Sequence, residues 1–343
     1  MPKRKERDTE PVQAELPLAK YLASTEKRVR DRAIRSLAAY LQNCAQEGGL
    51  SISQAELAKL WKGIFYCFWM SDKPLVQQAL AQELADLVLY TAGDFSETDE
   101  TSLDGDAGRN RALSALDFYH GFWTTIEAEW FGIDKYRTNK YYLLMRRMLN
   151  AGLTLLLLHG WHPTLLKRFA LVMGGKDGPL AANNVQIPDS IRYHVCDIFL
   201  DELESVSGKN DEKIPLLPLI TPFLELAAKS TSKRVYERVM SCVITPLLDA
   251  AKKEIVQKPS DYPQLLQRAV VAVEDDGDES ENDSDDDSAD EQQHTDSPNQ
   301  DIRRIVSVRR SILRAAFLIA SGSDTYAPSR RKLYAVWQAE EAQ

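Results

Sequence analysis

Apolar residues recur at helical spacing along nearly the whole chain, and alternating strand-like runs are scarce. In the stretch 26–46, Val29, Ala33, Leu37 and Leu41 follow one another at intervals of four residues. Such spacing places these side chains on one face of a helix, which buries that face against a neighbour. The pattern predicts an all-α fold.

Caps and turn residues mark where the expected helices begin and end. Ser53 and Glu56 have the spacing of a capping box, and Pro74 suits the first turn of a helix because its missing N–H costs nothing there. The resulting helices are expected over 26–46, 53–70, from 74 to the polar stretch 92–110, and then over 111–130, 134–158, 163–173, 188–204, 215–229 and 232–253. Short connections between successive helices predict antiparallel pairs stacked into a HEAT-like α-solenoid.

Charge is distributed very unevenly. The chain has 343 residues and a formal charge of -9, from 42 Lys and Arg against 51 Asp and Glu. Twelve of the acids fall between Glu274 and Glu291, a stretch without basic residues, and the remainder is mildly basic. Because the stretch 274–301 is too polar to bury a core, we expect a disordered acidic insert there. The acidic total therefore does not argue against nucleic-acid contact by the rest of the chain.

These observations divide the chain into four expected parts. They are a basic N-terminal tail at 1–12, a helical-repeat domain at 13–258, a linker with the disordered acidic tract at 259–301, and a basic C-terminal helical segment at 302–343. We expect the last segment to dock on the solenoid or on a partner.

Several classes of protein are disfavoured. The longest apolar runs are far shorter than the roughly 20 residues that span a bilayer, and the first residues, MPKRKER, do not resemble a secretory signal. We therefore expect no association with a membrane. The cysteines lack paired spacing and read as buried thiols in a reducing compartment: Cys44, Cys67, Cys196 and Cys242.

Catalytic motifs are missing from the sequence. The run GGKDG at 174–178 lacks the ending of a phosphate-binding loop and is interpreted as a turn. His159 and His162 flank a helix end rather than a metal site, and His120 and His194 have no ligand partner at a suitable spacing. We expect no enzymatic activity, no metal or other cofactor and no small-molecule substrate, although a set of dispersed catalytic residues remains an alternative.

Basic clusters are the best candidates for function. Arg28, Arg32 and Arg35 share one helical face, which suits phosphate oxygens. A second set stands among tyrosines and a third near the C-terminus: Lys135, Arg137 and Lys140, then Arg309, Arg310, Arg330, Arg331 and Lys332. Each set is a hypothesis for contact with RNA or a protein partner. The alternatives are a solvated helix face for the first set and neutralisation by the acidic tract for the last.

Two further features concern targeting and modification. A short basic cluster suits nuclear import and consists of Lys3, Arg4, Lys5 and Arg7. Each of Ser280, Ser284 and Ser288 has an acid three residues later, which is the pattern of an acid-directed kinase site. Phosphorylation there would add negative charge to the acidic tract. Together these features favour the nucleus.

Three segments carry a resemblance to a known family. They are KYLASTEKRVRDRAIRSLAAYL, LWKGIFYCFWMSDKPLVQQALAQELADLV and GIDKYRTNKYYLLMRRML. Over roughly residues 16–204 the chain resembles the eukaryotic ribosomal RNA processing protein 1 family, and the aromatic helix ending in WMSDKP is the most specific part. Lys73, which stands in that second segment, joins the residues expected at a partner surface.

The resemblance implies a non-catalytic helical scaffold in the nucleolus. It implies a need for the protein in large-subunit maturation, from the 27S precursor toward 25S/28S and 5.8S RNA, with pre-rRNA and other large-subunit assembly factors of the pre-60S particle as partners. An alternative from the residues alone is a nuclear adaptor or chaperone for basic proteins that acts through the acidic tract.

Overall fold

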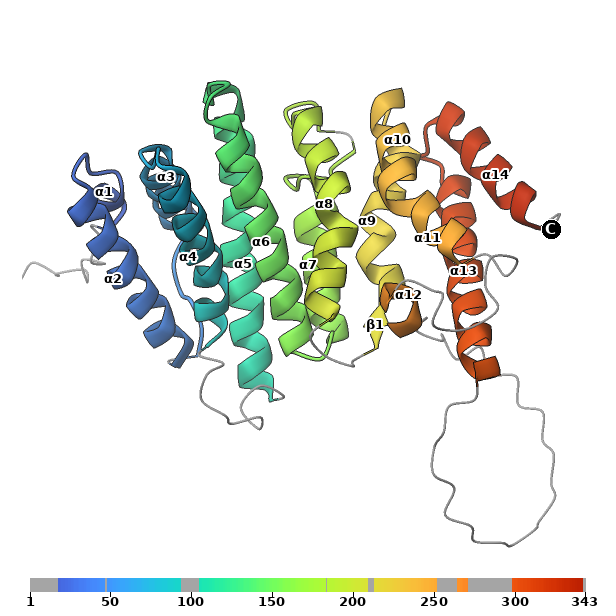
Figure 1. Ribbon diagram of the computed structural model, residues 1–343, viewed down its shortest axis with the longest axis horizontal. Coiled ribbons are helices and arrows are strands. Elements are labelled where there is room, and N and C mark those ends of the chain that lie inside the picture. Colours follow the sequence, from blue (N-terminus) through green and yellow to red (C-terminus); the bar gives the residue numbers. More distant parts are fainter. Residues whose placement is uncertain are drawn as a thin grey trace, which may run out of the picture.

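A computed structural model describes residues 18–46, 48–93, 105–182, 184–208, 213–251, 264–270 and 298–341. These residues are almost entirely helical, and the helices stack side by side in chain order into one elongated array (Figure 1). The all-α, HEAT-like solenoid of antiparallel helix pairs is therefore confirmed. The acidic tract, expected to be a disordered insert, lies outside the described residues.

The N-terminal half consists of three helix pairs. Its elements are α1 (Leu18–Leu22), α2 (Lys27–Gln46), α3 (Gln54–Trp69), α4 (Pro74–Ala92), α5 (Asp106–Glu129), the short 3-10 helix η2 (Trp130–Gly132) and α6 (Thr138–Leu158). The expected capping box is confirmed, since Ser53 Oγ accepts from the N–H of Glu56 and the Glu56 carboxylate accepts from the N–H of Ser53. The short α1 was not foreseen in the sequence.

The C-terminal half continues the stack. Its elements are α7 (Pro163–Gly174), α8 (Asp189–Ser207), β1 (Ile214–Pro215), α9 (Leu216–Lys229), α10 (Lys233–Val239), the π-helical turn η3 (Met240–Ile244), α11 (Thr245–Ala250), α12 (Gln264–Arg268), β2 (Ala269–Val270), α13 (Pro298–Ser321) and α14 (Ala327–Glu341). The helix expected over 232–253 is thus three successive helical pieces, α10, η3 and α11. The two-residue strands β1 and β2 pair in parallel, which the sequence did not indicate.

One long edge of the solenoid gathers every second connection. We define the turn edge as the connections α1–α2, α3–α4, α5–α6, α7–α8, α9–α10 and α13–α14, together with the helical turn on either side of each. Hydrogen bonds join neighbouring connections along it. Arg30 donates to the carbonyl of Met70, Trp130 donates to Ser190 at 3.0 Å, and the N–H of Tyr326 donates to the carbonyl of Ala228 at 2.9 Å.

The core runs the length of the stack between the two rows of helices. In the N-terminal half it is strongly aromatic: Trp61 lies 4.7 Å from Phe118 between ring centroids, and Phe65 stacks on Tyr141 at 4.8 Å. Polar atoms of these rings are satisfied, since Trp61 donates to the carbonyl of Phe118 at 2.8 Å. The aromatic residues around Trp61 therefore form part of the hydrophobic core.

The C-terminal segment docks on its own solenoid. Helix α13 packs against α9 and β2, and α14 packs against α13 and α9. Lys229 at the end of α9 lies 3.1 Å from Asp324 in the α13–α14 connection. Part of the expected linker is also structured, because 264–270 forms α12 and β2. The division of the chain into four parts stays a prediction.

Within the described residues, none of the helices is both long enough and apolar enough to cross a bilayer. Cys67 and Cys196 are buried, and Cys44 and Cys242 are half-buried, all as free thiols. Burial raises the pKa of Cys67 to about 11 and also raises the pKa of Cys196, so these two thiols are poor nucleophiles.

Candidate partner-binding surfaces

The basic face of α2 is exposed as expected. Arg28, Arg32 and Arg35 all lie on the solvent side of the helix. Arg30, which lies between them in the sequence, is buried and donates to the carbonyls of Ser24 and Thr25, both at 2.9 Å, which fixes the α1–α2 connection. The sequence cluster therefore separates into three exposed guanidinium groups and one structural one.

The α5–α6 connection holds the second basic set. Lys135 is exposed, and its ammonium lies 5.0 Å from the centre of the Tyr136 ring. Arg137 is half-buried: its guanidinium stacks over the Trp69 ring at 4.8 Å and pairs with Asp134 at 2.6 Å. Lys135 is thus free to meet a partner, whereas Arg137 is committed to holding the connection on α3.

Lys140 is not part of a surface, and its assignment as a contact residue is wrong. Its side chain is 3% exposed, and the ammonium donates to the carbonyls of Trp69 and Ser71. Burial lowers the pKa of Lys140 to about 8, opposed by the attraction of nearby Asp72. Helical spacing alone placed it among surface cations because the α3–α4 connection that covers it is distant in the sequence.

The C-terminal set is also divided. Arg310, Arg331 and Lys332 are exposed. Arg309 is half-buried and donates through Nε to the carbonyl of Leu248 at 3.3 Å. Arg330 is half-buried too, and its guanidinium donates to the carbonyls of Ala320 at 2.9 Å and Gly322 at 2.7 Å and so holds the end of α13. Contact of Arg330 with a partner stays a prediction.

Lys73 is exposed and occupies the N-cap position of α4 without a capping hydrogen bond from its side chain. A carboxylate oxygen of Asp72, the preceding residue, lies 3.6 Å from the guanidinium of Arg137 and 3.7 Å from the ammonium of Lys140. The import residues Lys3, Arg4, Lys5 and Arg7 and the serines Ser280, Ser284 and Ser288 lie outside the described residues.

The histidines interpreted as helix-end residues have that role. His162 is the N-cap of α7, and its Nδ1 accepts from the N–H of Thr164 at 3.2 Å, while Nε2 lies 2.8 Å from Arg109. His159 is the C-cap of α6. Among the described residues no cluster of three His, Cys, Asp or Glu side chains has a geometry that would hold a metal ion.

The structure contains a buried carboxyl group, that of Glu127, which no sequence pattern indicated. Glu127 on α5 is 9% exposed, and its Oε1 has no hydrogen-bond partner within the described structure. Burial raises the pKa of Glu127 to about 8, and the guanidinium of buried Arg192 opposes that rise. No sequence signal distinguishes this residue from a surface glutamate, since its burial depends on the packing of distant segments, from which Arg192 and Asp177 act on its charge.

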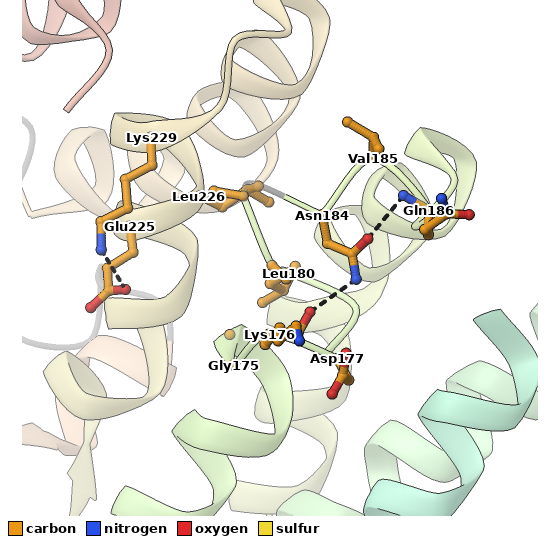
Figure 2. Close-up of a pocket in the computed structure, with 13 residues that line it drawn as sticks. Gly175, Lys176, Asp177, Leu180, Asn184, Val185, Gln186, Glu225, Leu226 and Lys229 are labelled. Atoms are coloured by element: carbon orange, nitrogen blue, oxygen red, sulfur yellow. Dashed lines mark hydrogen bonds and ion pairs between the residues drawn. The ribbon is translucent and has the colours of Figure 1, made fainter. Parts of the chain in front are cut away.

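A hollow of about 560 Å³ opens between the α7–α8 connection and the end of α9 (Figure 2). Asn184 braces its rim, donating to the carbonyl of Lys176 at 3.0 Å and accepting from the N–H of Gln186 at 2.9 Å. On the α9 side, the ammonium of Lys229 lies 3.3 Å from a carboxylate oxygen of Glu225. GGKDG forms the turn expected of it and contributes Gly174, Gly175, Lys176 and Asp177 to this wall.

Comparison with known proteins decides the family. Residues 13–335 match the family described as nucleolar protein Nop52. The chain belongs to the Nop52 family. The nucleolar description of the family confirms the localisation expected from the sequence, and the match covers both the solenoid and the C-terminal segment.

Curated relatives carry the name that the sequence resemblance indicated. Ribosomal RNA processing protein 1 homolog B of Homo sapiens is 36% identical over 236 residues, which is 69% of this chain and 28% of the relative. Homolog A of Homo sapiens is 30% identical over 284 residues, 83% of this chain and 56% of the relative. The Drosophila melanogaster homolog is 28% identical over 239 residues, 69% and 31% respectively. The chain therefore spans between about a quarter and a little over half of these relatives.

Proposed function

We propose that the protein is a non-catalytic scaffold in nucleolar biogenesis of the large ribosomal subunit, which holds pre-rRNA and other assembly factors. Membership of the Nop52 family supports a role in rRNA processing, since its relatives are named for that process. The step we propose is maturation of the 27S precursor toward 25S/28S and 5.8S RNA.

The observation that carries RNA contact is the α2 face. Arg28, Arg32 and Arg35 are exposed on one side of one helix, and guanidinium groups bind phosphate oxygens through paired donors. A scaffold of this kind needs surfaces rather than a catalytic pocket, and a solenoid offers an extended one. We assign the exposed lysines of the turn edge, such as Lys73 and Lys135, to contact with protein partners of the assembly.

Depletion of the protein tests the proposal. We expect the 27S precursor to accumulate, 60S subunits to fall, and the tagged protein to co-sediment with pre-60S particles. Unchanged precursor and 60S levels would refute the assigned role. Deleting residues 274–291 tests the adaptor alternative, because a scaffold keeps its association with the particle without the acidic tract whereas an acid-dependent chaperone loses its clients.

A further inference from the structure

Exposed large apolar side chains gather at the turn edge. Eight such side chains occur in the described part of the chain, and each lies in a turn-edge connection or in the helical turn beside one: Tyr21, Leu75, Phe131, Tyr136, Leu171, Val185, Leu318 and Tyr326. Scattered single apolar residues are normal on a protein surface, but a set confined to one edge indicates a contact surface.

The most exposed of these side chains are held on firmly anchored backbone. Val185 is 91% exposed and Tyr136 is 83% exposed. Asp134 Oδ1 accepts from the N–H groups of Tyr136 at 2.9 Å and Arg137 at 3.1 Å, which fixes the loop that presents Tyr136. Their exposure is therefore a property of an ordered surface, and little ordering entropy would be lost when a partner binds.

Two hollows lie along this edge. One is the hollow of about 560 Å³ beside Val185 and Lys229, seen in Figure 2. The other, of about 360 Å³, opens between α2 and α4, where Leu75 stands near Lys27 and Arg35. Each hollow is lined by an exposed aliphatic side chain and by both cations and acids, and each is large enough to receive an apolar side chain from a partner.

Positive charge accompanies the apolar side chains. Exposed cations of the turn edge outnumber exposed acids by eight to four among the described residues. The cations are Lys20, Lys27, Arg28, Lys73, Lys135, Lys176, Lys233 and Arg234, and the acids are Glu26, Asp72, Asp177 and Asp324. Two of the acids, Asp72 and Asp324, lie close to cations of this chain, and two of the cations, Lys27 and Lys233, lie close to acids, so the excess of positive charge remains. A partner that complements the edge is thus acidic.

We propose that the turn edge is the docking surface for an acidic segment of a partner polypeptide, whose apolar side chains enter the two hollows while its carboxylates face the edge lysines and arginines. A polypeptide fits better than single-stranded RNA because half of the exposed apolar set, including Leu75 and Val185, is aliphatic and offers no ring for a base to stack on. The inference rests on the proposed function only in taking the partner to be a protein of the same assembly.

Binding of defined peptides to the full chain tests the proposal. The probes are fluorescent 20-residue peptides measured by anisotropy: one with Glu and Asp interspersed with Leu and Phe, one with Ser replacing Leu and Phe, and one with Lys replacing the acids. A single-stranded 20-nucleotide RNA is the fourth probe. Among the peptides, we expect only the acidic, apolar one to bind well, with an affinity that falls as salt rises. We expect the RNA to bind through the α2 face instead, so variants of the turn edge should leave its affinity within about twofold.

Variants of the edge locate the binding. Leu75→Ser with Val185→Ser removes one apolar side chain beside each hollow, and Lys73→Glu with Lys135→Glu reverses two exposed charges. Each pair of substitutions should raise the dissociation constant of the acidic, apolar peptide about tenfold or more. The matched control is Lys167→Glu with Lys213→Glu, exposed positions away from the turn edge, which should leave binding within about twofold. Because all six positions are exposed, thermal melting should be nearly unchanged.

Three results would overturn the inference. Equal binding by wild type and both edge variants places the contact elsewhere. Loss of RNA binding in the edge variants, without binding of the acidic peptide by the wild type, makes the edge an RNA surface. A dimer in sedimentation that the edge variants abolish makes a second copy the occupant. None of these would alter the effect of depletion on the 27S precursor, which tests the proposed function separately.

Discussion

The ammonium of Lys140 lies 2.7 Å from the carbonyl oxygen of Trp69 and fastens the first turn of α6 to the end of α3. It donates to the carbonyl of Ser71 as well, at 2.9 Å. A cation is well placed there, since the last carbonyls of a helix have no partner inside the helix and form the negative end of its dipole. One buried lysine thus sets the spacing between two successive helix pairs.

Lys140→Met should therefore destabilise the fold, because the carbonyl of Trp69 loses the donor from α6 and the carbonyl of Ser71 keeps only the donor from Gln77. We expect a loss of about 1–3 kcal/mol in the free energy of unfolding, measured by urea denaturation. Lys135→Met, five residues earlier and exposed, is the control and should change stability by less than about 0.5 kcal/mol. Equal effects of the two variants would contradict the structural role of Lys140.

Glu127 should make stability depend on pH. Its pKa is raised from 4.5 to about 8 in the folded protein, mainly by burial. Between these values the folded state holds a proton that the unfolded chain has released. The contribution of Glu127 to stability is therefore fully present below about pH 4.5 and is lost as the pH rises toward 8.

Glu127→Gln removes this ionisation while keeping the shape of the side chain. As the pH rises from 5 to 8, the wild type should lose stability relative to the variant. The unfolding free energy of the variant should gain on that of the wild type by on the order of 2–4 kcal/mol. Thermal melting across that range measures it. A constant difference would mean that Glu127 keeps an ordinary pKa in the folded protein.

Gly121 on α5 permits the close approach of Trp61. A Cβ added at Gly121 would lie 2.6 Å from Nε1 of Trp61, whose hydrogen bond to the carbonyl of Phe118 it would disturb. Gly121→Ala should cost about 1–3 kcal/mol of stability. Gly132→Ala is the control, because a Cβ there meets nothing within 4 Å. Equal melting temperatures of the two variants would show that the helices simply move apart.

Charge reversal of Arg28, Arg32 and Arg35 tests the α2 face. If all three meet phosphates, replacement by Glu should lower the slope of log affinity against log salt for single-stranded RNA by about 2. Circular dichroism should be unchanged, since the three side chains are exposed. An unchanged slope would mean that these three arginines face solvent and do not contact phosphates.

Local signals predicted the architecture well. Ser53 with Glu56, and Pro74, mark helix starts that the structure places within a residue. These signals depend on residues within one helical turn of each other, so they can be recognised from the sequence alone. Helix α1, the β1–β2 pair and the π-helical turn η3 were missed because distant packing, rather than local spacing, determines them.

The candidate surfaces were harder to predict for the same reason. Arg28 and Arg30 look alike in the sequence, yet Arg30 is buried and donates to the carbonyl of Met70 in the next helix pair, whereas Arg28 is exposed. Lys140 and Arg330 were likewise interpreted as surface cations, although both cap main-chain carbonyls. A long cation reaches across several residues of chain, so its environment depends on tertiary neighbours that spacing does not reveal.

The proposed role in large-subunit biogenesis is tested most directly by depleting the protein. The quantities to measure are the levels of 27S precursor and of 60S subunits, with and without re-expression of this chain. We expect the precursor to accumulate and 60S subunits to fall, and we expect re-expression of the chain to restore both levels. Normal precursor and subunit levels after verified depletion would contradict the proposed role.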